Sequence, residues 1–314
     1  MNGWRDAPAR GAESVSFLLD VLPNPKHALF YPARELGFFR DAGINVEIGA
    51  GKGSADVIQL VASGSATFGF ADAGAVALAR SRGIPITLIG MVHYKTLMSI
   101  ITRAGSGVKT PKDLAGKSIA TTSGDSVRTL FPAFASINGI DEGAVTFVTA
   151  SHSAKSGMLL EGHVDGVCDY LSAFPIYKKA AKQVGIDLSA LSYGDYGISI
   201  YSNGIIASDS TLKDAPDKAR AFMKGIIRAL NFAAQSPAEA ANIFQSLYKD
   251  YDQEVTREGL DIALQHLLVP EAKASGLGHM SSERMAETVQ MTVNAYHLNA
   301  TVPTSTMFSN SYLS

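Results

Sequence analysis

Polar and aromatic side chains alternate in a short segment that follows the first expected strand. Asp20, Asn24 and His27 come first and Tyr31 follows them, on a loop that two prolines stiffen. Such a loop can present hydrogen-bonding groups with little loss of entropy when a molecule binds. We expect these four residues to contact a small polar ligand, with Asp20 accepting hydrogen bonds from it. The alternative is that they only cap a strand-to-helix turn.

Small and polar residues recur where other expected strands lead into helices. Backbone N–H groups at a helix start suit a polar or anionic group, and aromatic rings can cover a flat ligand. The further candidate ligand-binding residues are Ser54, Asp72, Ser123, Asp125, Asp169, Tyr170 and Tyr196.

Signatures of catalysis and of metal binding are weak. The run Gly116-Lys117-Ser118 lacks the first glycine of a phosphate-binding loop and leads into a strand. The histidines show no helical spacing with carboxylates, and the single cysteine, Cys168, has no nucleophile signature. An acid–base pair of Asp20 and His27 has no nucleophile or cofactor motif beside it. We therefore predict no enzyme, no catalytic residue, no metal and no cofactor.

The elements that must position these residues alternate between strands and helices, which predicts a mainly parallel α/β architecture. Strands are expected at 15–19, 45–48, 67–71, 86–92, 99–102, 118–121, 146–148 and 166–169, with a paired run at 198–202 and 204–207. Helices are expected between them, including 54–63 with Ser54 as N-cap. After Pro216 the periodicity indicates helices at 217–234, 237–248, 253–268 and 282–298.

The second α/β unit is inserted between the first unit and its closing strand. The predicted division is a poorly ordered leader at 1–13, a first lobe of 14–102 and 204–314, and a second lobe of 103–203. Two strands must then cross between lobes, near 99–103 and 199–205, and form a hinge with a cleft between the lobes. Ligands bind beyond the carboxyl ends of strands in such sheets.

Composition excludes several function classes. The 314 residues are 46% hydrophobic, enough for a sizeable core, and 27 basic residues against 29 acidic ones give no electrostatic reason to expect nucleic acid. No apolar run approaches the roughly 20 residues that span a bilayer. The first 14 residues lack the apolar region of a secretory signal. The chain is then either cytosolic or a mature form without its signal.

The segment LLDVLPNPKHALFYPARELGFFRDAGINVEI (18–48) resembles the solute-binding proteins of ABC transporters of the thiamine-pyrimidine-precursor and sulfonate/taurine type. It is similar to that family's Asp-Trp-x-Pro-Asn-x-x-His-x-x-x-Tyr motif. Four further segments are similar in sequence to members of this family: 60–73, 79–90, 108–120 and 236–244. The resemblance covers nearly the whole chain after Val15.

The resemblance implies a two-lobed type II periplasmic-binding-protein fold that closes around one ligand by hinge motion. It implies a small, nitrogen-heteroaromatic, pyrimidine-like ligand, an ABC permease and its ATPase as partners, a periplasmic or cell-surface location and a monomer. Asp20, Asn24, His27 and Tyr31 match the motif. Ser54, Ser123 and Asp125 match loop positions, and Asp169 and Tyr170 lie where the pyrimidine branch carries cleft residues.

Two departures from the family pattern matter. Val21 replaces the motif's tryptophan and removes a stacking surface, and Pro32 requires the first helix to be kinked or to start later. Open alternatives are a sulfonate, a flavin precursor or another small organic anion as ligand. A pyrimidine synthase on the same fold is less favoured, because the loop 70–75 lacks that enzyme's lysine and histidine and the cysteine-rich run is absent. A regulator's ligand-sensing domain would need a helix-turn-helix before the first strand.

Overall fold

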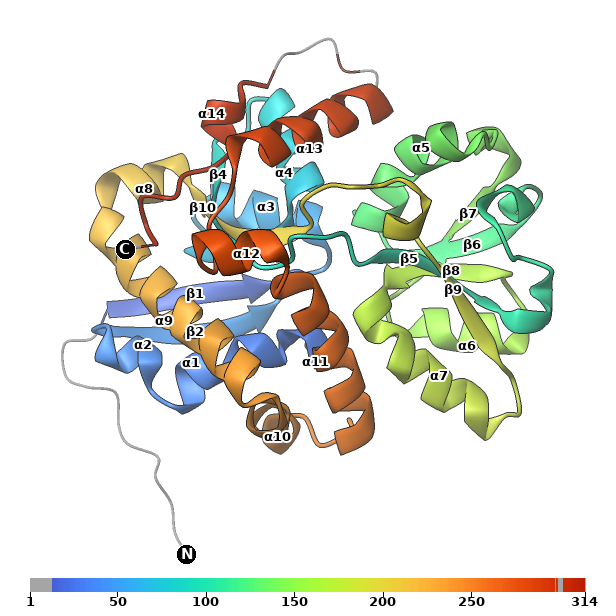
Figure 1. The fold of residues 1–314 in the computed structure, drawn as a ribbon, viewed down its shortest axis with the longest axis horizontal. Coiled ribbons are helices and arrows are strands. Elements are labelled where there is room, and N and C mark those ends of the chain that lie inside the picture. Colours follow the sequence, from blue (N-terminus) through green and yellow to red (C-terminus); the bar gives the residue numbers. More distant parts are fainter. Residues whose placement is uncertain (1–12, 297, 299–301, 314) are drawn as a thin grey trace, which may run out of the picture.

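The chain folds into two five-stranded sheets that form two lobes side by side (Figure 1). The computed structural model describes residues 13–296, 298 and 302–313. The predicted leader therefore lies outside the described residues except for Glu13, which begins the first strand. The first sheet has the order β2-β1-β3-β10-β4 and the second the order β7-β6-β8-β5-β9.

The strands lie close to the expected positions. Those of the first sheet are β1 (Glu13–Leu19), β2 (Ile44–Ala50), β3 (Phe68–Asp72), β4 (Ile86–Met91) and β10 (Asn203–Ser208). Those of the second are β5 (Met98–Arg103), β6 (Ser118–Thr121), β7 (Thr146–Thr149), β8 (Gly166–Tyr170) and β9 (Leu188–Ser192). Strand β9 was not predicted from the sequence.

The prediction of mainly parallel sheets is correct for half of each sheet. β1 pairs in parallel with β2 and β3, and β6 pairs in parallel with β7 and β8. In contrast, β10 is antiparallel to β3 and β4, and β5 is antiparallel to β8 and β9. The reason is the insertion itself: β5 and β10 each follow a crossing, so they enter their sheet from the edge where the parallel strands end.

Two chain segments connect the lobes, residues 92–97 and 197–202. The predicted crossings were strands near 99–103 and 199–205. The structure places 99–103 within β5 of the second sheet, and both observed crossings lie before the strands β5 and β10. Backbone hydrogen bonds hold the two segments side by side: His93 N–H donates to the carbonyl of Asn203, and Ser202 N–H donates to the carbonyl of His93. The predicted pairing of 198–202 with 204–207 is wrong, because Asn203–Ser208 is one continuous strand and 198–202 belongs to the crossing.

Helices cover both sheets. Those of the first part are α1 (Tyr31–Glu35), α2 (Phe38–Asp41), α3 (Ser54–Ala62) and α4 (Ala73–Ser81), and those of the second lobe are α5 (Ser126–Asn138), α6 (Ala154–Glu161) and α7 (Phe174–Gln183), of which α7 was not predicted. The C-terminal part is helical as expected, with α8 (Asp209–Asp214), α9 (Pro216–Gln235), α10 (Pro237–Leu247), α11 (Gln253–Leu267), α12 (Pro270–Ser275), α13 (Ser282–Ala295) and α14 (Thr304–Met307).

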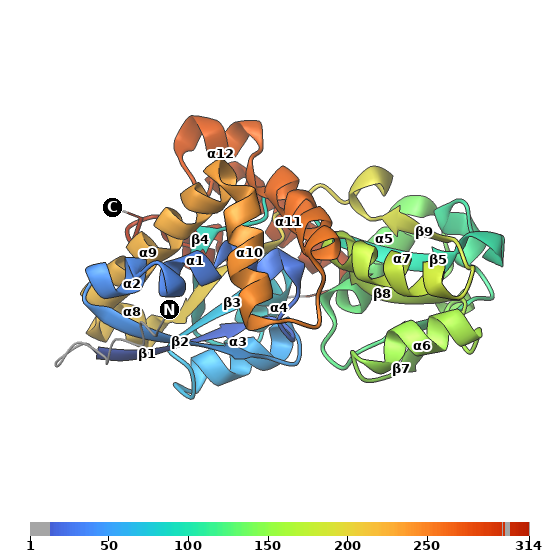
Figure 2. The same ribbon diagram turned by 90° about the horizontal axis from the view of Figure 1, so that it is seen from below.

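The C-terminal helices complete the first lobe rather than forming a separate unit. On α9, the ring of Phe222 stacks on Phe68 at 4.1 Å between centroids and packs edge-on against Phe17 at 5.2 Å. Figure 2 shows α9 and α10 on one side of the sheet that holds β1, β2 and β3, with α11 beside α10 toward the second lobe. Because these aromatic contacts join residues far apart in the sequence, the first lobe is complete only when the chain has returned from the second.

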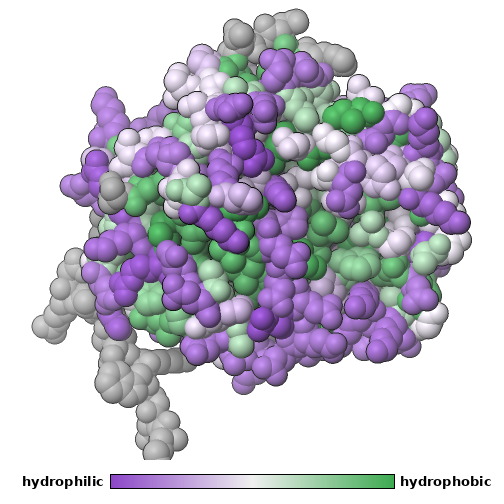
Figure 3. Space-filling model, in the orientation of Figure 1, coloured by the Kyte–Doolittle hydropathy of each residue, from purple (hydrophilic) through white to green (hydrophobic). Residues whose placement is uncertain are grey.

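The surface is mixed in character. Hydrophilic residues cover much of the face shown in Figure 3, and apolar residues show between them toward its centre. Among the described residues, no helix has both the length and the apolar character needed to cross a membrane.

Candidate ligand-binding site

The loop after β1 is folded by its own side chains. It contains a 3-10 helix, η1 (Pro25–Leu29), that begins with a capping box: the Asn24 side-chain oxygen accepts from Lys26 N–H, and His27 Nδ1 accepts from Asn24 N–H. Pro25 stands in the first turn, where its missing N–H costs nothing. Pro32 likewise falls in the first turn of α1, so the helix does start later, as predicted. The result is that Lys26 and His27 turn back toward Asp20.

Asp20 is a buried hub with four donors on its two carboxylate oxygens. Oδ2 lies 2.6 Å from Lys26 Nζ and 3.3 Å from Asn203 Nδ2, and Oδ1 lies 2.8 Å from His27 Nε2 and 3.0 Å from Val21 N. Burial by itself would raise the pKa of Asp20, but the Lys26 ammonium and His27 hold it well below its usual range. Burial lowers the pKa of His27 to about 4, against the pull of Asp20. His27 is therefore neutral at pH 7 and both ring nitrogens are engaged.

The second lobe has a similar ion pair. Lys155 Nζ lies 3.0 Å from Asp169 Oδ2 and 2.6 Å from the carbonyl oxygen of Cys168, and Tyr177 donates to Asp169 at 2.7 Å. Burial would lower the pKa of Lys155, but the carboxylates of Asp169 and Asp125 outweigh it and raise that pKa. Burial would raise the pKa of Asp169, yet Lys155 holds it below its usual range. Each lobe thus brings a buried lysine–aspartate pair to the cleft.

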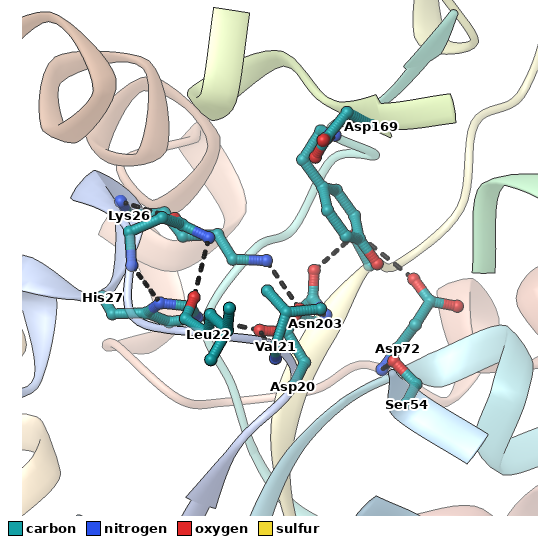
Figure 4. A network of polar contacts seen from close by, with 12 residues as sticks. Asp20, Val21, Leu22, Lys26, His27, Ser54, Asp72, Asp169 and Asn203 are labelled. Carbon is teal, nitrogen blue, oxygen red and sulfur yellow. Dashed lines mark hydrogen bonds and ion pairs between the residues drawn. The ribbon is translucent and has the colours of Figure 1, made fainter. Parts of the chain in front are cut away.

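Tyr170, at the end of β8, links the two lobes. It directly follows Asp169, which Figure 4 shows opposite Lys26, Asn203 and Asp72 of the first lobe. Lys26 Nζ lies 3.9 Å from the centre of its ring, a cation–π contact. Its hydroxyl is in hydrogen-bonding contact with the side chain of Asn203, and burial and the nearby carboxylate of Asp72 raise its pKa well above the usual range. Tyr170 comes from the second lobe and its three neighbours from the first, so these contacts exist only while the cleft is closed.

A small cavity lies between the lobes, with a volume of about 20 Å³, roughly the space of one water. It is lined by Asp20, Val21, Gly53, Ser54, Thr122, Asp125, Ser126, His152, Lys155, Asp169 and Tyr170. Among them, the Ser126 hydroxyl is buried without a hydrogen-bond partner. The cleft is nearly shut, so a ring-sized ligand requires the lobes to separate first.

The structure brings five of the predicted site residues to this cavity: Asp20, Ser54, Asp125, Asp169 and Tyr170. Two more act behind it, since Asn24 and His27 hold the loop that carries Asp20. Asp72 caps α4, where Gly74 N–H donates to its Oδ1 at 2.9 Å, and burial raises its pKa to about 6. The N-cap of α3 is Gly53 and not the predicted Ser54. The Ser54 hydroxyl instead accepts a hydrogen bond from Asp72 N–H.

The other three predicted residues lie elsewhere. Ser123 lines a wider groove of about 680 Å³ that adjoins the cavity through Val21, Thr122 and His152. Tyr31 does not line the cavity of this closed form, and its hydroxyl pairs with that of Tyr248 inside the first lobe. Tyr196 does not line it either, and packs edge-on against Phe134 within the second lobe. The Tyr31 ring packs against Phe244 of α10 and Tyr248, and the Tyr196 ring packs against α5. Contact of these two residues with a ligand stays a prediction.

Sequence reasoning missed Lys26, Lys155 and Asn203. Lys26 stands at an unspecified position of the family motif, and Lys155 lies on a helix start without any motif. Asn203 was interpreted as half of a turn with Gly204. Of the three, only Lys26 is unusual for its place. Every residue of η1 is buried, and a lysine is rarely found in a fully buried helix.

Among the described residues, neither the Asp20–His27 pair nor Cys168 is free to react. The Asp20–His27 contact resembles an acid–base pair, but His27 has no ring nitrogen left to exchange a proton with a substrate. Burial raises the pKa of Cys168 well above the usual range, so its thiol stays protonated. In the part of the chain that the structure describes, no group of three or more histidine, cysteine, aspartate or glutamate residues could hold a metal ion.

Two lobes joined by two crossings, with a closed cleft between them, define the class of type II periplasmic binding proteins. The structure is similar to the alkanesulfonate-binding protein SsuA from Xanthomonas axonopodis pv. citri, solved with MOPS, with a TM-score of 0.74 and 15% identity over 95% of this chain and 98% of that one. This likeness shows the fold. The NMT1/THI5 like family profile matches residues 24–240, and the chain belongs to this family.

Two curated relatives differ in what their names describe. The formylaminopyrimidine-binding protein of Halalkalibacterium halodurans is 25% identical over 271 residues, which cover 84% of this chain and 81% of that protein. The 4-amino-5-hydroxymethyl-2-methylpyrimidine phosphate synthase THI13 of Saccharomyces cerevisiae is 24% identical over 241 residues, 73% of this chain and 69% of that enzyme. The family therefore contains both binding proteins and synthases.

Proposed function

We propose that this protein is the solute-binding component of an ABC importer and captures a small, neutral nitrogen heterocycle, a pyrimidine precursor of thiamine. The observation that carries the proposal is the cavity built from both lobes, with Asp20 and Ser54 on one side and Asp169 and Tyr170 on the other. A group of residues that meets only on closure is what a receptor needs if ligand binding is to drive closure. The formylaminopyrimidine-binding relative supports the choice of ligand.

The charges around the cleft favour a neutral ligand over an anion. Asp20 and Lys26 neutralise each other, as do Asp169 and Lys155. The remaining ionisable acids are Asp125, whose pKa burial raises, and Asp72, whose pKa burial raises to about 6. Any net charge beside the cavity is therefore negative, which disfavours the sulfonate or other organic anion kept as the alternative.

Binding would proceed by opening and closing of the lobes. The ligand enters the open cleft, rests on the first lobe beside the Asp20 loop, and closure brings Tyr170 and Lys155 over it. A dissociation constant in the micromolar range corresponds to about −8 kcal/mol, which one covered ring and a few hydrogen bonds can supply. In this role the partners are an ABC permease and its ATPase, the location is periplasmic or at the cell surface, and the protein acts as a monomer.

A synthase activity is the second candidate, since some relatives are synthases. The loop at the end of β3 offers Asp72, Ala73, Gly74 and Ala75, without lysine or histidine. We therefore expect no turnover of pyridoxal phosphate and no covalent adduct with it, as checked by intact-protein mass spectrometry.

Isothermal titration calorimetry of the full chain tests the ligand class. Formylaminopyrimidine and 4-amino-5-hydroxymethyl-2-methylpyrimidine are expected to bind with micromolar or lower dissociation constants, and an alkanesulfonate at least a hundredfold more weakly. The matched variant Tyr170→Leu removes the ring that covers the cleft and should weaken pyrimidine binding about tenfold or more. Binding of the sulfonate in preference to both pyrimidines would overturn the proposal.

A further inference from the structure

Among the described residues whose side chains contact Asp20, Lys26 has hydrogen-bond donors that remain unused. An ammonium has three donors, and among the described residues the hydrogen-bond acceptor of Lys26 Nζ is Asp20 Oδ2. Both oxygens of Asp20 already accept two hydrogen bonds each, and His27 uses both ring nitrogens. The side chain of Lys26 is fully buried.

What covers the ammonium is an aromatic ring from the opposite lobe. The centre of the Tyr170 ring lies 3.9 Å from Lys26 Nζ, and the ring of Phe70 from the first lobe lies farther away at 5.6 Å. When the lobes separate, Tyr170 leaves with β8, and Lys26 remains with η1 and Asp20. In the open cleft, the Lys26 ammonium and its unused donors are therefore exposed, whereas in the closed form the Tyr170 ring covers them.

We infer that Lys26 determines the ligand specificity of this cleft by donating a hydrogen bond to an acceptor nitrogen in the ring of the ligand. This inference rests on the proposed function, because it assigns the chemistry of the same site. An incoming ring that carries an acceptor atom can replace Tyr170 at the ammonium, because Lys26 has donors that Asp20 does not use.

Selectivity between two neutral probes tests this assignment. The probes are 4-amino-5-hydroxymethyl-2-methylpyrimidine and its pyridine analogues, in which a CH group replaces one ring nitrogen and removes an acceptor without adding a charge. Wild type should prefer the pyrimidine about tenfold or more over the analogue that lacks the contacted nitrogen, as measured by calorimetry. In the double variant Asp20→Asn/Lys26→Met, which removes the ammonium without leaving the carboxylate unpaired, the preference should fall below about threefold.

The double variant serves as its own folding control. A single Lys26→Met change leaves a buried carboxylate without its ammonium and is expected to lower the melting temperature strongly, whereas the double variant should melt near wild type. A purely structural role of Lys26 would weaken both probes equally. An unchanged ratio between the two probes in the folded double variant would overturn the inference.

A measurement without ligand separates this inference from the ligand assignment. Reductive methylation followed by peptide mass spectrometry should label Lys26 in the wild-type protein more slowly than the exposed Lys52, because Lys26 reacts only when the cleft opens. Replacing the covering ring by Tyr170→Leu should speed the labelling of Lys26 severalfold and leave that of Lys52 unchanged. Failure of wild type to bind any pyrimidine refutes the proposed function, whereas an unlabelled Lys26 under complete labelling of Lys52 refutes the inference whatever the ligand.

Discussion

At the scale of single residues, the site is organised by a buried carboxylate whose hydrogen bonds are all internal. A buried ion pair gains little net stability, because the desolvation of both charges offsets their attraction. The Asp20–Lys26 pair therefore serves to hold side chains in place rather than to raise the stability of the fold. Asp20 holds Lys26, His27 and Asn203 at fixed distances, and so connects the motif loop to the start of β10.

The carboxyl of Asp72 gives a pH-dependent prediction. Burial raises its pKa from 3.8 to about 6. Between these values the folded chain holds a proton that the unfolded chain has lost, so the buried carboxyl costs stability above pH 6 and the cost disappears as the pH falls toward 4. Asp72→Asn removes the charge and keeps an N-cap residue for α4. The variant's stability relative to wild type should therefore be higher at pH 7.5 than at pH 4.5, by about 2 kcal/mol.

Urea unfolding of both proteins at the two pH values measures this difference. Because the two chains share every other titrating group, those contributions cancel in the comparison. A difference between the proteins that is the same at pH 7.5 and pH 4.5 would show that Asp72 is ionised as easily as a solvated aspartate.

At the scale of elements, α11 contacts both lobes. It packs against η1 of the first lobe, and it also contacts α7 and the short 3-10 helix η5 (Leu171–Ala173) of the second. Gly259 makes this close approach possible. A Cβ atom there would lie 2.5 Å from Cβ of Pro25 and 2.6 Å from the carbonyl oxygen of Ser172. On the rim, Lys179 and Asp252 form an exposed ion pair between α7 and α11, which adds little by itself.

Alanine at two helical glycines should have opposite effects. Gly157→Ala in α6, where the nearest atom to the new Cβ is 3.9 Å away, should raise the free energy of unfolding by about 0.5–1 kcal/mol through helix propensity. Gly259→Ala gains the same propensity but forces two backbone segments apart, and should lower it by about 1–3 kcal/mol. Thermal and urea unfolding of the two variants make the comparison. Stabilisation by both changes would contradict the close packing of α11 between the lobes.

At the scale of the whole molecule, closure requires two glycines to meet across the cleft. A Cβ on Gly53 of the first lobe would lie 3.0 Å from the carbonyl oxygen of Gly124 in the second, and a Cβ on Gly124 would lie 3.2 Å from Cβ of Ala55. These contacts lie between the inner cavity and the wider groove beside it. We infer that the absence of side chains at both positions allows the lobes to close fully.

Gly124→Ala should weaken closure, and Gly107→Ala is its matched control. Both glycines have a left-handed backbone, with φ of +73° and +80°, so both changes should cost about 1–2 kcal/mol of stability. Only at Gly124 does a Cβ meet the opposite lobe, since Gly107 has nothing within 4 Å. Gly124→Ala alone should lower pyrimidine affinity about tenfold and reduce the ligand-induced decrease in radius of gyration measured by X-ray scattering. Equal affinities in the two variants would show that this contact does not limit closure.

The sequence by itself determined the local and repetitive features. Apolar periodicity predicted the helices near 217–234, 237–248, 253–268 and 282–298, and the structure has α9, α10, α11 and α13 there. The alternation of strands and helices, with one unit inserted in another, predicted the two lobes. The motif with Asp20, Asn24 and His27 predicted the loop that carries the site, because its hydrogen bonds join residues close in sequence.

Only the tertiary structure decided which side chains meet across the cleft. Lys26 and Tyr170 come together because β1 and β8 end at facing edges of two different sheets, and Lys155 joins them from a helix without a motif. The same holds for Tyr31 and Tyr196, which the sequence placed at the ligand and which the fold places in packing contacts within one lobe. Contacts of this kind depend on how two lobes pack and close, and the periodicity of a single strand or helix carries no information about its partner in the other lobe.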